Sequence, residues 1–212
     1  MSALYYCRQT TTACKGIPYP SKTHPYRYGT SGCVYTSGCG VCASLMALRN
    51  STTRVFNTRQ WTHRCLGMGA RAAEGTDMAV VARYMKEKYG LDYAITTDMD
   101  RLVAHLKQGY TAIINVSGGG KMLFSNSGHY VVAVGIDKNG NLIILDPYWY
   151  DGKFTLTAAR RKYTRVKNGR EVYVRPADLK GDVLSLWLFT PKRDVRLAYS
   201  THDIHYRKSA PT

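Results

Sequence analysis

The sequence predicts an α+β fold with a helical N-terminal half packed on a C-terminal antiparallel β-sheet. Apolar patterns with helical spacing recur between residues 39 and 109, and β-branched apolar runs recur from residue 111 to residue 189. Helices that precede a separate set of strands are typical of this fold class. The pair Asn139-Gly140, between two apolar runs, is a strong signal for a tight hairpin turn. The strands on either side of it are therefore expected to pair antiparallel.

The first helix is predicted to begin at Cys39. Residues 36–48 form a glycine-flanked loop that runs into an apolar segment, and Gly38 and Gly40 allow a sharp turn and leave space beside the sulfur. A cysteine in the first helical turn lies near unpaired N–H groups and the positive end of the helix dipole, which favours the thiolate. Cys39 is therefore a candidate nucleophile. The competing interpretation makes Cys39 and Cys42 small buried apolar residues or half of a metal site.

A histidine and an aspartate flank the predicted hairpin. His129 opens the apolar run 129–136, and Asp146 follows the return run 142–145. In a hairpin with a short turn, the start of one strand lies beside the end of the other. The two side chains are therefore expected at the same edge of the sheet, where a carboxylate can orient an imidazole.

Three more helices and further strands complete the expected fold. The sequence Ser117-Gly118-Gly119-Gly120-Lys121 lacks the spacing of a phosphate-binding loop and is interpreted as a mobile loop beside the cleft. The helices are expected to pack with the nucleophile helix: one from Asn57 to about Leu66, one from Met78 that Gly90 closes, and one capped by Thr97 or Asp98 that ends near Gly109. The remaining expected strands are 111–116, 171–174 and 185–189, and the last is expected to close the sheet.

Three motifs in this order resemble the papain-like cysteine peptidases. They are Ser37-Gly38-Cys39-Gly40, Gly128-His129-Tyr130-Val131-Val132 and Asp146-Pro147. Within that clan the chain most resembles relatives of the C39-type peptidases, which remove double-glycine leaders from bacteriocins. The resemblance spans roughly residues 26–150 and implies a papain-like fold that needs no metal or organic cofactor. By the same resemblance, Cys39 is the nucleophile, His129 the general base and Asp146 its orienting partner.

The sequence departs from the family pattern near the nucleophile. Papain-like enzymes usually carry an oxyanion-binding glutamine several residues upstream, but here Cys33 stands six residues before Cys39. The backbone N–H of Cys39 supplies one donor. The second donor is left open among the hydroxyls of Tyr35, Thr36 and Ser37. Many relatives also have Gly-Pro-Thr or Gly-Pro-Ser where this chain has Gly-Val-Cys at residues 40–42.

Length and composition indicate a single folded unit. The chain of 212 residues is long enough to bury a core, and no linker separates a second domain. We expect one catalytic domain over residues 1–192, with an irregular arm over residues 1–36, and a basic, loosely ordered tail over residues 193–212. The sequence shows neither a membrane-spanning apolar stretch nor a secretory signal, so synthesis in the cytoplasm without a signal peptide is expected.

The formal charge of +16 at pH 7 predicts attraction to polyanions such as the bacterial cell wall, nucleic acid or an anionic membrane. All six cysteines lie in the first third of the chain. Without a signal peptide they are expected to be mostly reduced thiols, although disulfides and zinc stay open. A zinc site at Cys7, Cys14, Cys33 and Cys42, with His24 or His63 as substitutes, is the alternative, and the state of Cys65 stays open.

Two classes of function follow. The first is a cysteine hydrolase of amide bonds. A basic catalytic domain without signal peptide or transporter segment resembles a phage or prophage lysin, an endopeptidase or amidase that acts on peptidoglycan at the cell wall after release. A C39-like protease that processes proteins or peptides is the alternative enzyme. The second class is a nucleic-acid-binding protein on an inactivated peptidase fold, in which basic residues 158–170 contact phosphates.

Overall fold

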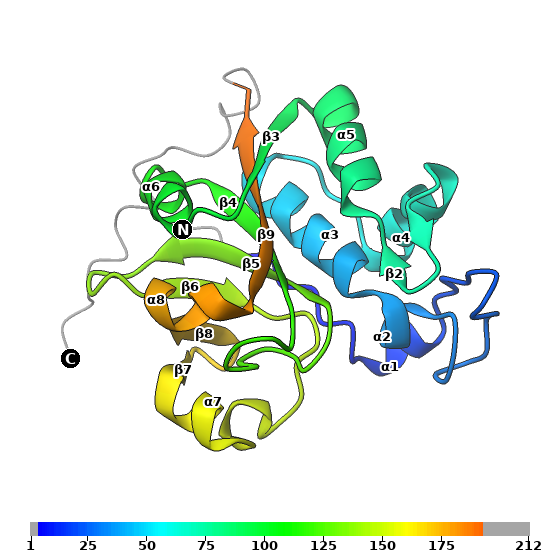
Figure 1. Cartoon of the computed structure of the whole chain (residues 1–212). Coiled ribbons are helices and arrows are strands. Elements are labelled where there is room, and N and C mark those ends of the chain that lie inside the picture. Colours follow the sequence, from blue (N-terminus) through cyan, green and yellow to red (C-terminus); the bar gives the residue numbers. More distant parts are fainter. Residues whose placement is uncertain (1–3, 193–212) are drawn as a thin grey trace.

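The computed structural model describes residues 4–192, and its centre is a seven-stranded antiparallel sheet (Figure 1). Neighbouring strands follow the order β3-β9-β4-β5-β6-β8-β7. The predicted tail over residues 193–212 lies outside the described residues. The strands are β3 (Leu91–Thr96), β4 (Thr111–Val116), β5 (His129–Ile136), β6 (Leu142–Leu145), β7 (Thr164–Lys167), β8 (Glu171–Val174) and β9 (Val183–Pro191), and β1 (Arg71–Ala72) and β2 (Gly75–Thr76) form a separate pair.

Helices cover both faces of the large sheet, with α3, α4 and α5 on one side and α6 on the other (Figure 1). None of the helices within residues 4–192 has the length and apolar character needed to cross a membrane. The α-helices are α1 (Thr12–Lys15), α2 (Val34–Ser37), α3 (Cys39–Ser51), α4 (Thr58–Gly67), α5 (Met78–Tyr89), α6 (Met99–Lys107), α7 (Ala158–Tyr163) and α8 (Pro176–Leu179), and the 3₁₀-helices are η1 (Lys153–Thr155) and η2 (Lys180–Asp182).

The sheet separates two apolar cores, because successive side chains of a strand point to opposite faces. In β4, Ile113 packs into the core shared with α3, whereas Ile114 packs into the core shared with α6. Helix α3 is buried along most of its length, including Leu45 and Met46 at 0% exposure. Burial on all sides fixes the position of its first residue, Cys39, against the sheet.

Capping residues in the sequence correctly predict where α4 and α6 begin and where α5 ends. The Asn57 side chain accepts from the backbone N–H of Gln60, and the Gln60 side chain accepts from the N–H of Asn57, which forms a complete capping box for α4. Gly90 adopts a left-handed conformation with φ +65° and ends α5. Asp98, rather than Thr97, caps α6 by accepting from the N–H groups of residues 100 and 101.

The expectation that all three later helices pack with the nucleophile helix is wrong for α6. Its buried residues Leu102 and Leu106 belong to the core on the opposite face of the sheet. The cause is β3, which the sequence pattern did not reveal because Asp92, Tyr93 and Thr96 interrupt its apolar residues. β3 pairs with β9 at the edge of the sheet. It therefore carries the chain past the sheet edge before α6 begins.

The strand at residues 185–189 is confirmed as part of β9, but it does not close the sheet. β9 lies between β3 and β4 and pairs with both. A strand that is paired on two sides belongs to the interior of the sheet. Among the described residues, the edge positions fall to β3 and β7.

The glycine-rich loop 117–121, expected to be mobile, is flanked by contacts with Asp182, and at its start the Ser117 N–H donates to the Asp182 carbonyl at 2.7 Å. Both carboxylate oxygens of Asp182, which is 1% exposed, accept backbone hydrogen bonds, from Met122 at 3.1 Å and from Leu123 at 2.9 Å. A Cβ added at Gly120 would lie 2.2 Å from Oδ1 of the same aspartate. The glycine thus allows the backbone to approach Asp182 closely, which explains the composition of the loop.

The N-terminal arm connects α3 with the loop after β6. Over residues 4–36 it is irregular apart from the one-turn helix α1, the start of α2 and two isolated bridges, Pro18 with Cys33 and Arg27 with Ser31. The Tyr5 N–H donates to the Asn50 side chain at 2.8 Å, and the Tyr6 hydroxyl donates to the Asp146 carbonyl at 2.6 Å. Further along, the Gln9 N–H donates to the Pro147 carbonyl at 2.8 Å. The arm therefore packs behind the site that Cys39 and Asp146 form.

Candidate active site

Cys39 is the first residue of α3, as the sequence predicts. Two close approaches explain the glycines beside it. A Cβ at Gly38 would lie 2.5 Å from the carbonyl oxygen of Val34, and a Cβ at Gly40 would lie 2.5 Å from the Cβ of Thr76. Real Cβ atoms do not approach so closely, so both positions require glycine. The glycines allow α2 to turn directly into α3 and bring β2 against the first turn of the nucleophile helix.

Cys39 differs from the other cysteines in its access to solvent. It is partly exposed, whereas Cys7, Cys14, Cys33, Cys42 and Cys65 are buried, and all six are free thiols. Within residues 4–192, no group of three or more histidine, cysteine, aspartate or glutamate side chains is arranged to hold a metal ion. The alternative of a zinc site at these cysteines therefore has no support among the described residues.

The β5–β6 hairpin brings His129 and Asp146 together. His129 is the first residue of β5, and Asp146 directly follows β6, whose Leu145 pairs with Val132. His129 Nε2 donates to Asp146 Oδ1 at 2.8 Å, and both side chains are buried. This bond occupies Nε2 and leaves Nδ1 for the hydrogen bond between His129 and the Cys39 thiol. The three predicted residues therefore form one connected group.

The electrostatics of the group favour an ion pair between Cys39 and His129. Burial opposes ionisation of the thiol, but the hydrogen bond and charge of His129 outweigh it, helped by N–H groups of Tyr130 and Gly40, and lower the pKa of Cys39. Burial also opposes protonation of the imidazole, yet Asp146 and Cys39 raise the pKa of His129 to about 9. A thiolate beside an imidazolium is the reactive form of a cysteine nucleophile.

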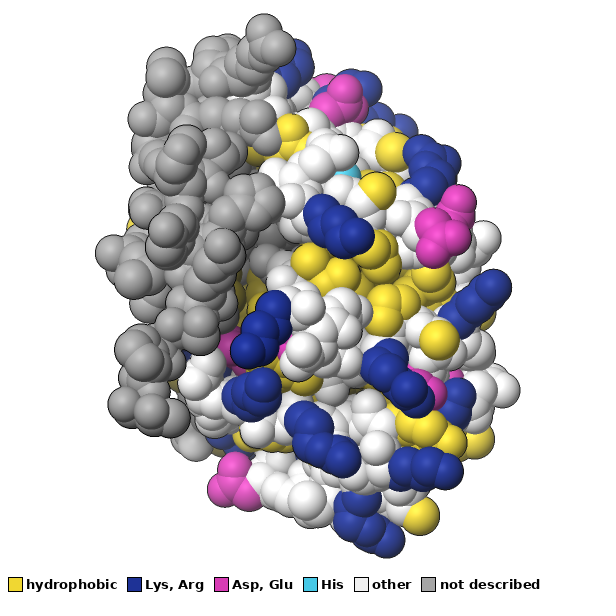
Figure 2. Space-filling model, turned by 90° about the vertical axis from the view of Figure 1, so that its left-hand side faces the viewer, with side chains coloured by type: hydrophobic (Ala, Val, Ile, Leu, Met, Phe, Trp, Pro, Cys, Tyr) yellow, Lys and Arg dark blue, Asp and Glu magenta, His cyan; other side chains and the backbone are white. Residues whose placement is uncertain are grey.

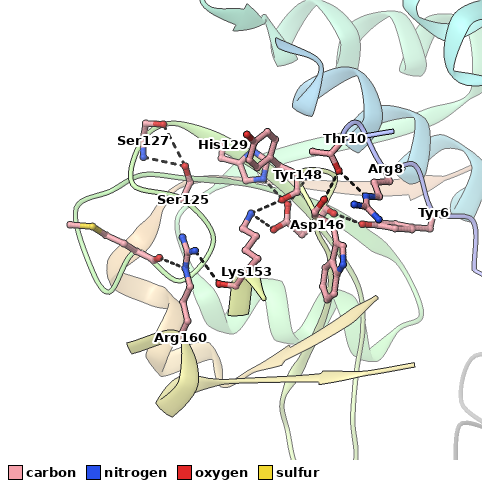
Figure 3. A network of polar contacts seen from close by, with 12 residues as sticks. Tyr6, Arg8, Thr10, Ser125, Ser127, His129, Asp146, Tyr148, Lys153 and Arg160 are labelled. Carbon is pink, nitrogen blue, oxygen red and sulfur yellow. Dashed lines mark hydrogen bonds and ion pairs between the residues drawn. The ribbon is translucent and has the colours of Figure 1, made fainter. Parts of the chain in front are cut away.

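Asp146 has a second cationic partner that the sequence pattern did not reveal. Lys153 Nζ lies 2.6 Å from Asp146 Oδ2, the carboxylate oxygen that does not bond to His129 (Figure 3). Burial opposes ionisation of the carboxyl, but His129 and Lys153 together lower the pKa of Asp146 to about 2. Lys153 lies seven residues after Asp146, in a 3₁₀ turn without a recognisable motif. Only the folded loop makes it a neighbour.

Tyr148 lies on the solvent side of the pair formed by His129 and Asp146. Its N–H donates to Asp146 Oδ1 at 2.9 Å, and its ring meets the His129 ring edge-on, with centroids 6.3 Å apart (Figure 3). Tyr148 is 40% exposed whereas His129 beside it is 6% exposed, which fits a tyrosine that keeps water from the imidazole. Exclusion of water strengthens the hydrogen bond between His129 and Asp146.

The side chains near the expected oxyanion site are partly engaged elsewhere. The hydroxyl of Thr36 donates to the Cys33 carbonyl at 3.2 Å and lies 3.5 Å from the hydroxyl of Ser37. The arm brings Gln9 beside α2, where its Nε2 donates to the Tyr35 carbonyl at 3.2 Å. Gln9 is far from Cys39 along the chain, so no local pattern in the sequence indicates its place beside α2.

Comparisons with known proteins identify the family. The model of the Peptidase_C39 like family matches residues 14–172. No curated protein matches the chain.

Solved structures with a similar chain path include two bacterial peptidase domains. The peptidase domain of Streptococcus ComA, a bi-functional ABC transporter involved in a quorum-sensing pathway, shares 14% identity at a TM-score of 0.48, covering 73% of this chain and 91% of that one. The peptidase domain of Streptococcus mutans ComA shares 15% identity at a TM-score of 0.44, covering 74% and 93%. UfSP from C. elegans shares 17% identity at a TM-score of 0.39, covering 74% and 30%.

The family match extends over most of the described chain and includes the cysteine at the start of α3 and the hairpin that carries the histidine and the aspartate. The chain belongs to the Peptidase_C39 like family and is a cysteine peptidase with a papain-like fold.

Proposed function

We propose that this peptidase hydrolyses amide bonds of peptidoglycan at the bacterial cell wall, with Cys39 as nucleophile, His129 as general base and acid, and Asp146 as the orienting carboxylate. The observation that carries the choice of substrate is the formal charge of +16. A strongly basic protein is drawn to polyanionic surfaces, and the bacterial wall is such a surface.

In the first half-reaction the Cys39 thiolate attacks the carbonyl carbon. A carbon–sulfur bond forms, the carbonyl electron pair moves to oxygen, and the backbone N–H of Cys39 stabilises this oxyanion. When the oxyanion collapses, the carbon–nitrogen bond breaks. The imidazolium of His129 gives its proton to the leaving amine, which leaves an acyl-enzyme and a neutral imidazole.

In the second half-reaction neutral His129 takes a proton from water, and the water oxygen attacks the thioester carbon. The carbon–sulfur bond breaks, the carboxylic acid leaves, and the thiolate and the imidazolium return. Asp146 holds the imidazole in one orientation throughout, because its Oδ1 accepts from Nε2 at 2.8 Å. Cys39, His129 and Asp146 together with one water thus account for every proton and electron pair in the reaction.

Cationic side chains outnumber acidic ones on the surface, as Figure 2 shows for one face of the molecule. Lys162, Arg165 and Lys167 line a cavity of about 390 Å³ that also includes Asp137 and Asn141, the residues of the β5–β6 turn. This turn is the end of the hairpin opposite His129. In the proposal these cations contact wall anions away from the reacting bond, so attachment and hydrolysis use different parts of the protein.

A C39-like protease that processes proteins or peptides is the second candidate, and family membership is the observation that favours it. The same three residues would perform the same chemistry on a polypeptide. The two candidates therefore differ in the substrate and not in the mechanism.

Digestion of purified Gram-positive and Gram-negative peptidoglycans by the wild type and by Cys39→Ala tests the proposal, with products identified by mass spectrometry. We expect defined fragments with new free amino groups from the wild type only. Fragments from both proteins would disprove the role of Cys39. No fragments from any wall would reject peptidoglycan, and a panel of double-glycine peptides would then test the processing protease.

Binding to DNA over a range of salt concentrations, measured with Cys39→Ala, tests the nucleic-acid alternative. Tight, salt-dependent binding without any hydrolysis by the wild type would favour that alternative over both enzyme candidates.

A further inference from the structure

The carboxylate of Asp146 lies between two cationic groups, one on each oxygen. Oδ1 accepts from His129 Nε2 at 2.8 Å, and Oδ2 accepts from Lys153 Nζ at 2.6 Å (Figure 3). The Asp146 side chain is 0% exposed and that of Lys153 is 2% exposed. Lysine is among the residues least often buried, and a buried charge is tolerated only when it is paired. The position of Lys153 therefore needs an explanation.

Several contacts hold Lys153 in place. Its Nζ also donates to the Tyr148 carbonyl at 2.8 Å, and it lies 5.7 Å from the centre of the Phe154 ring. Arg160 Nη1 donates to the Lys153 carbonyl at 3.2 Å, and Arg160 Nε donates to the Met122 carbonyl at the same distance (Figure 3). The ammonium therefore has a fixed place beside the carboxylate.

The four groups form a neutral set in the resting enzyme. The Cys39 thiolate balances the His129 imidazolium, and the Asp146 carboxylate balances the Lys153 ammonium. In the acyl-enzyme the sulfur is covalently bound and His129 is neutral, so the pair of Asp146 and Lys153 remains and is still neutral. Without Lys153, both states would bury one uncompensated negative charge, which is costly.

We propose that Lys153 is a positioning residue of the catalytic group, and that its ammonium keeps Asp146 ionised and directed at His129 while the proton of His129 leaves and returns. Lys153 acts through Asp146 and does not itself exchange protons with the substrate. This proposal rests on the proposed roles of Cys39, His129 and Asp146. It holds for any substrate that the enzyme hydrolyses.

Other charged and titratable groups lie around Asp146 and Lys153 and affect their ionisation. The Tyr6 hydroxyl donates to the Asp146 carbonyl at 2.6 Å, and burial and Asp146 raise the pKa of Tyr6, so this group stays neutral. Burial, with a contribution from the nearby Arg160, lowers the pKa of Lys153 overall, although Asp146 acts to raise it. The charge of Cys39 also acts on Lys153 and favours the ammonium. By reciprocity, the ammonium favours the Cys39 thiolate.

The test measures the thiolate of Cys39 and needs no substrate. The rate of alkylation of Cys39 by iodoacetamide is recorded from pH 4 to pH 9, with the modified peptide identified by mass spectrometry. Lys153→Met removes the charge and keeps the length of the side chain, and Lys153→Gln removes the charge but keeps an N–H donor. Lys86→Met is the matched control, because it breaks an exposed lysine–aspartate pair, Lys86 with Asp92 at 2.8 Å.

We expect the midpoint of the alkylation profile to rise by at least about half a pH unit in whichever neutral variants fold, with about threefold slower alkylation below the midpoint. Lys86→Met should reproduce the wild-type profile. A wild-type midpoint in a folded Lys153 variant, or an equal shift in Lys86→Met, would overturn the proposal. Failure to find peptidoglycan cleavage leaves this test unaffected, so the two proposals fail independently.

Discussion

Cys39 and Cys42 lie one turn apart on α3 and have opposite chemical environments. Cys39 is partly exposed, and its contact with His129 lowers its pKa despite burial. Cys42 is fully buried, and burial together with contact with the Cys7 thiol raises its pKa well above the ordinary value. The same element thus carries a reactive thiol and an inert one. The difference arises from what the sheet and the N-terminal arm place beside each sulfur.

The largest difference between the two cysteines is expected in activity. Cys39→Ala should reduce hydrolysis by at least about 10⁴-fold, because the nucleophile is lost. Cys42→Ala should keep hydrolysis close to that of the wild type and lower the free energy of unfolding by about 1–2 kcal/mol, since it leaves a small cavity in the core. Peptide hydrolysis and urea unfolding of both variants measure this. Equal loss of activity in the two would remove the distinction.

Asp146→Asn should have the next largest effect, a loss of about 10²–10⁴-fold in kcat/KM. His129 contacts one carboxylate oxygen and Lys153 the other, whereas an amide places its single oxygen at only one of these two positions and an NH₂ group at the other. The double variant Asp146→Asn/Lys153→Met frees the amide oxygen for His129, so it should be more active than Asp146→Asn alone. If the double variant is less active than the single one, this account of the two oxygens is wrong.

The pH dependences of alkylation and of hydrolysis by the wild type distinguish the ionisation of Cys39 from that of His129. Alkylation of Cys39 needs only the thiolate, so its rate should rise at a pH below the ordinary range for cysteine and then stay high. Hydrolysis also needs the proton on His129, whose pKa is raised to about 9. Its rate should therefore fall as the pH rises through about 9, by about tenfold per unit. Two curves that fall together above pH 9 would contradict the ion pair.

The last prediction concerns stability alone, at Gly40, which lies between the two cysteines. Gly40→Ala should lower the free energy of unfolding by about 1–3 kcal/mol, because the new Cβ would lie 2.5 Å from the Cβ of Thr76. Gly67→Ala is the matched control, since no atom lies within 4 Å of the new Cβ at the end of α4. That substitution should be neutral or stabilising by up to about 1 kcal/mol. Thermal unfolding of both variants measures whether the close approach of β2 to Gly40 requires glycine for stability.

Signals within one element were readable from the sequence. The capping box of Asn57 and Gln60, the left-handed Gly90 and the Asn-Gly turn of the hairpin each depend on residues a few positions apart. The hairpin alone was enough to predict that His129 and Asp146 lie at one edge of the sheet. The helix start at Cys39 followed in the same way from its flanking glycines.

Contacts between distant or irregular segments were decided only by the tertiary structure. Polar residues interrupt the apolar pattern of β3, so this strand was not predicted. The face of the sheet on which α6 packs was therefore predicted wrongly. Lys153, which has no motif, became a partner of Asp146 through the fold of one loop, and the arm brought Cys7 against Cys42. Periodicity and capping residues indicate which secondary structure a segment favours on its own. The pairing of buried charged groups depends on how distant segments pack against one another. No local pattern in the sequence indicates this packing.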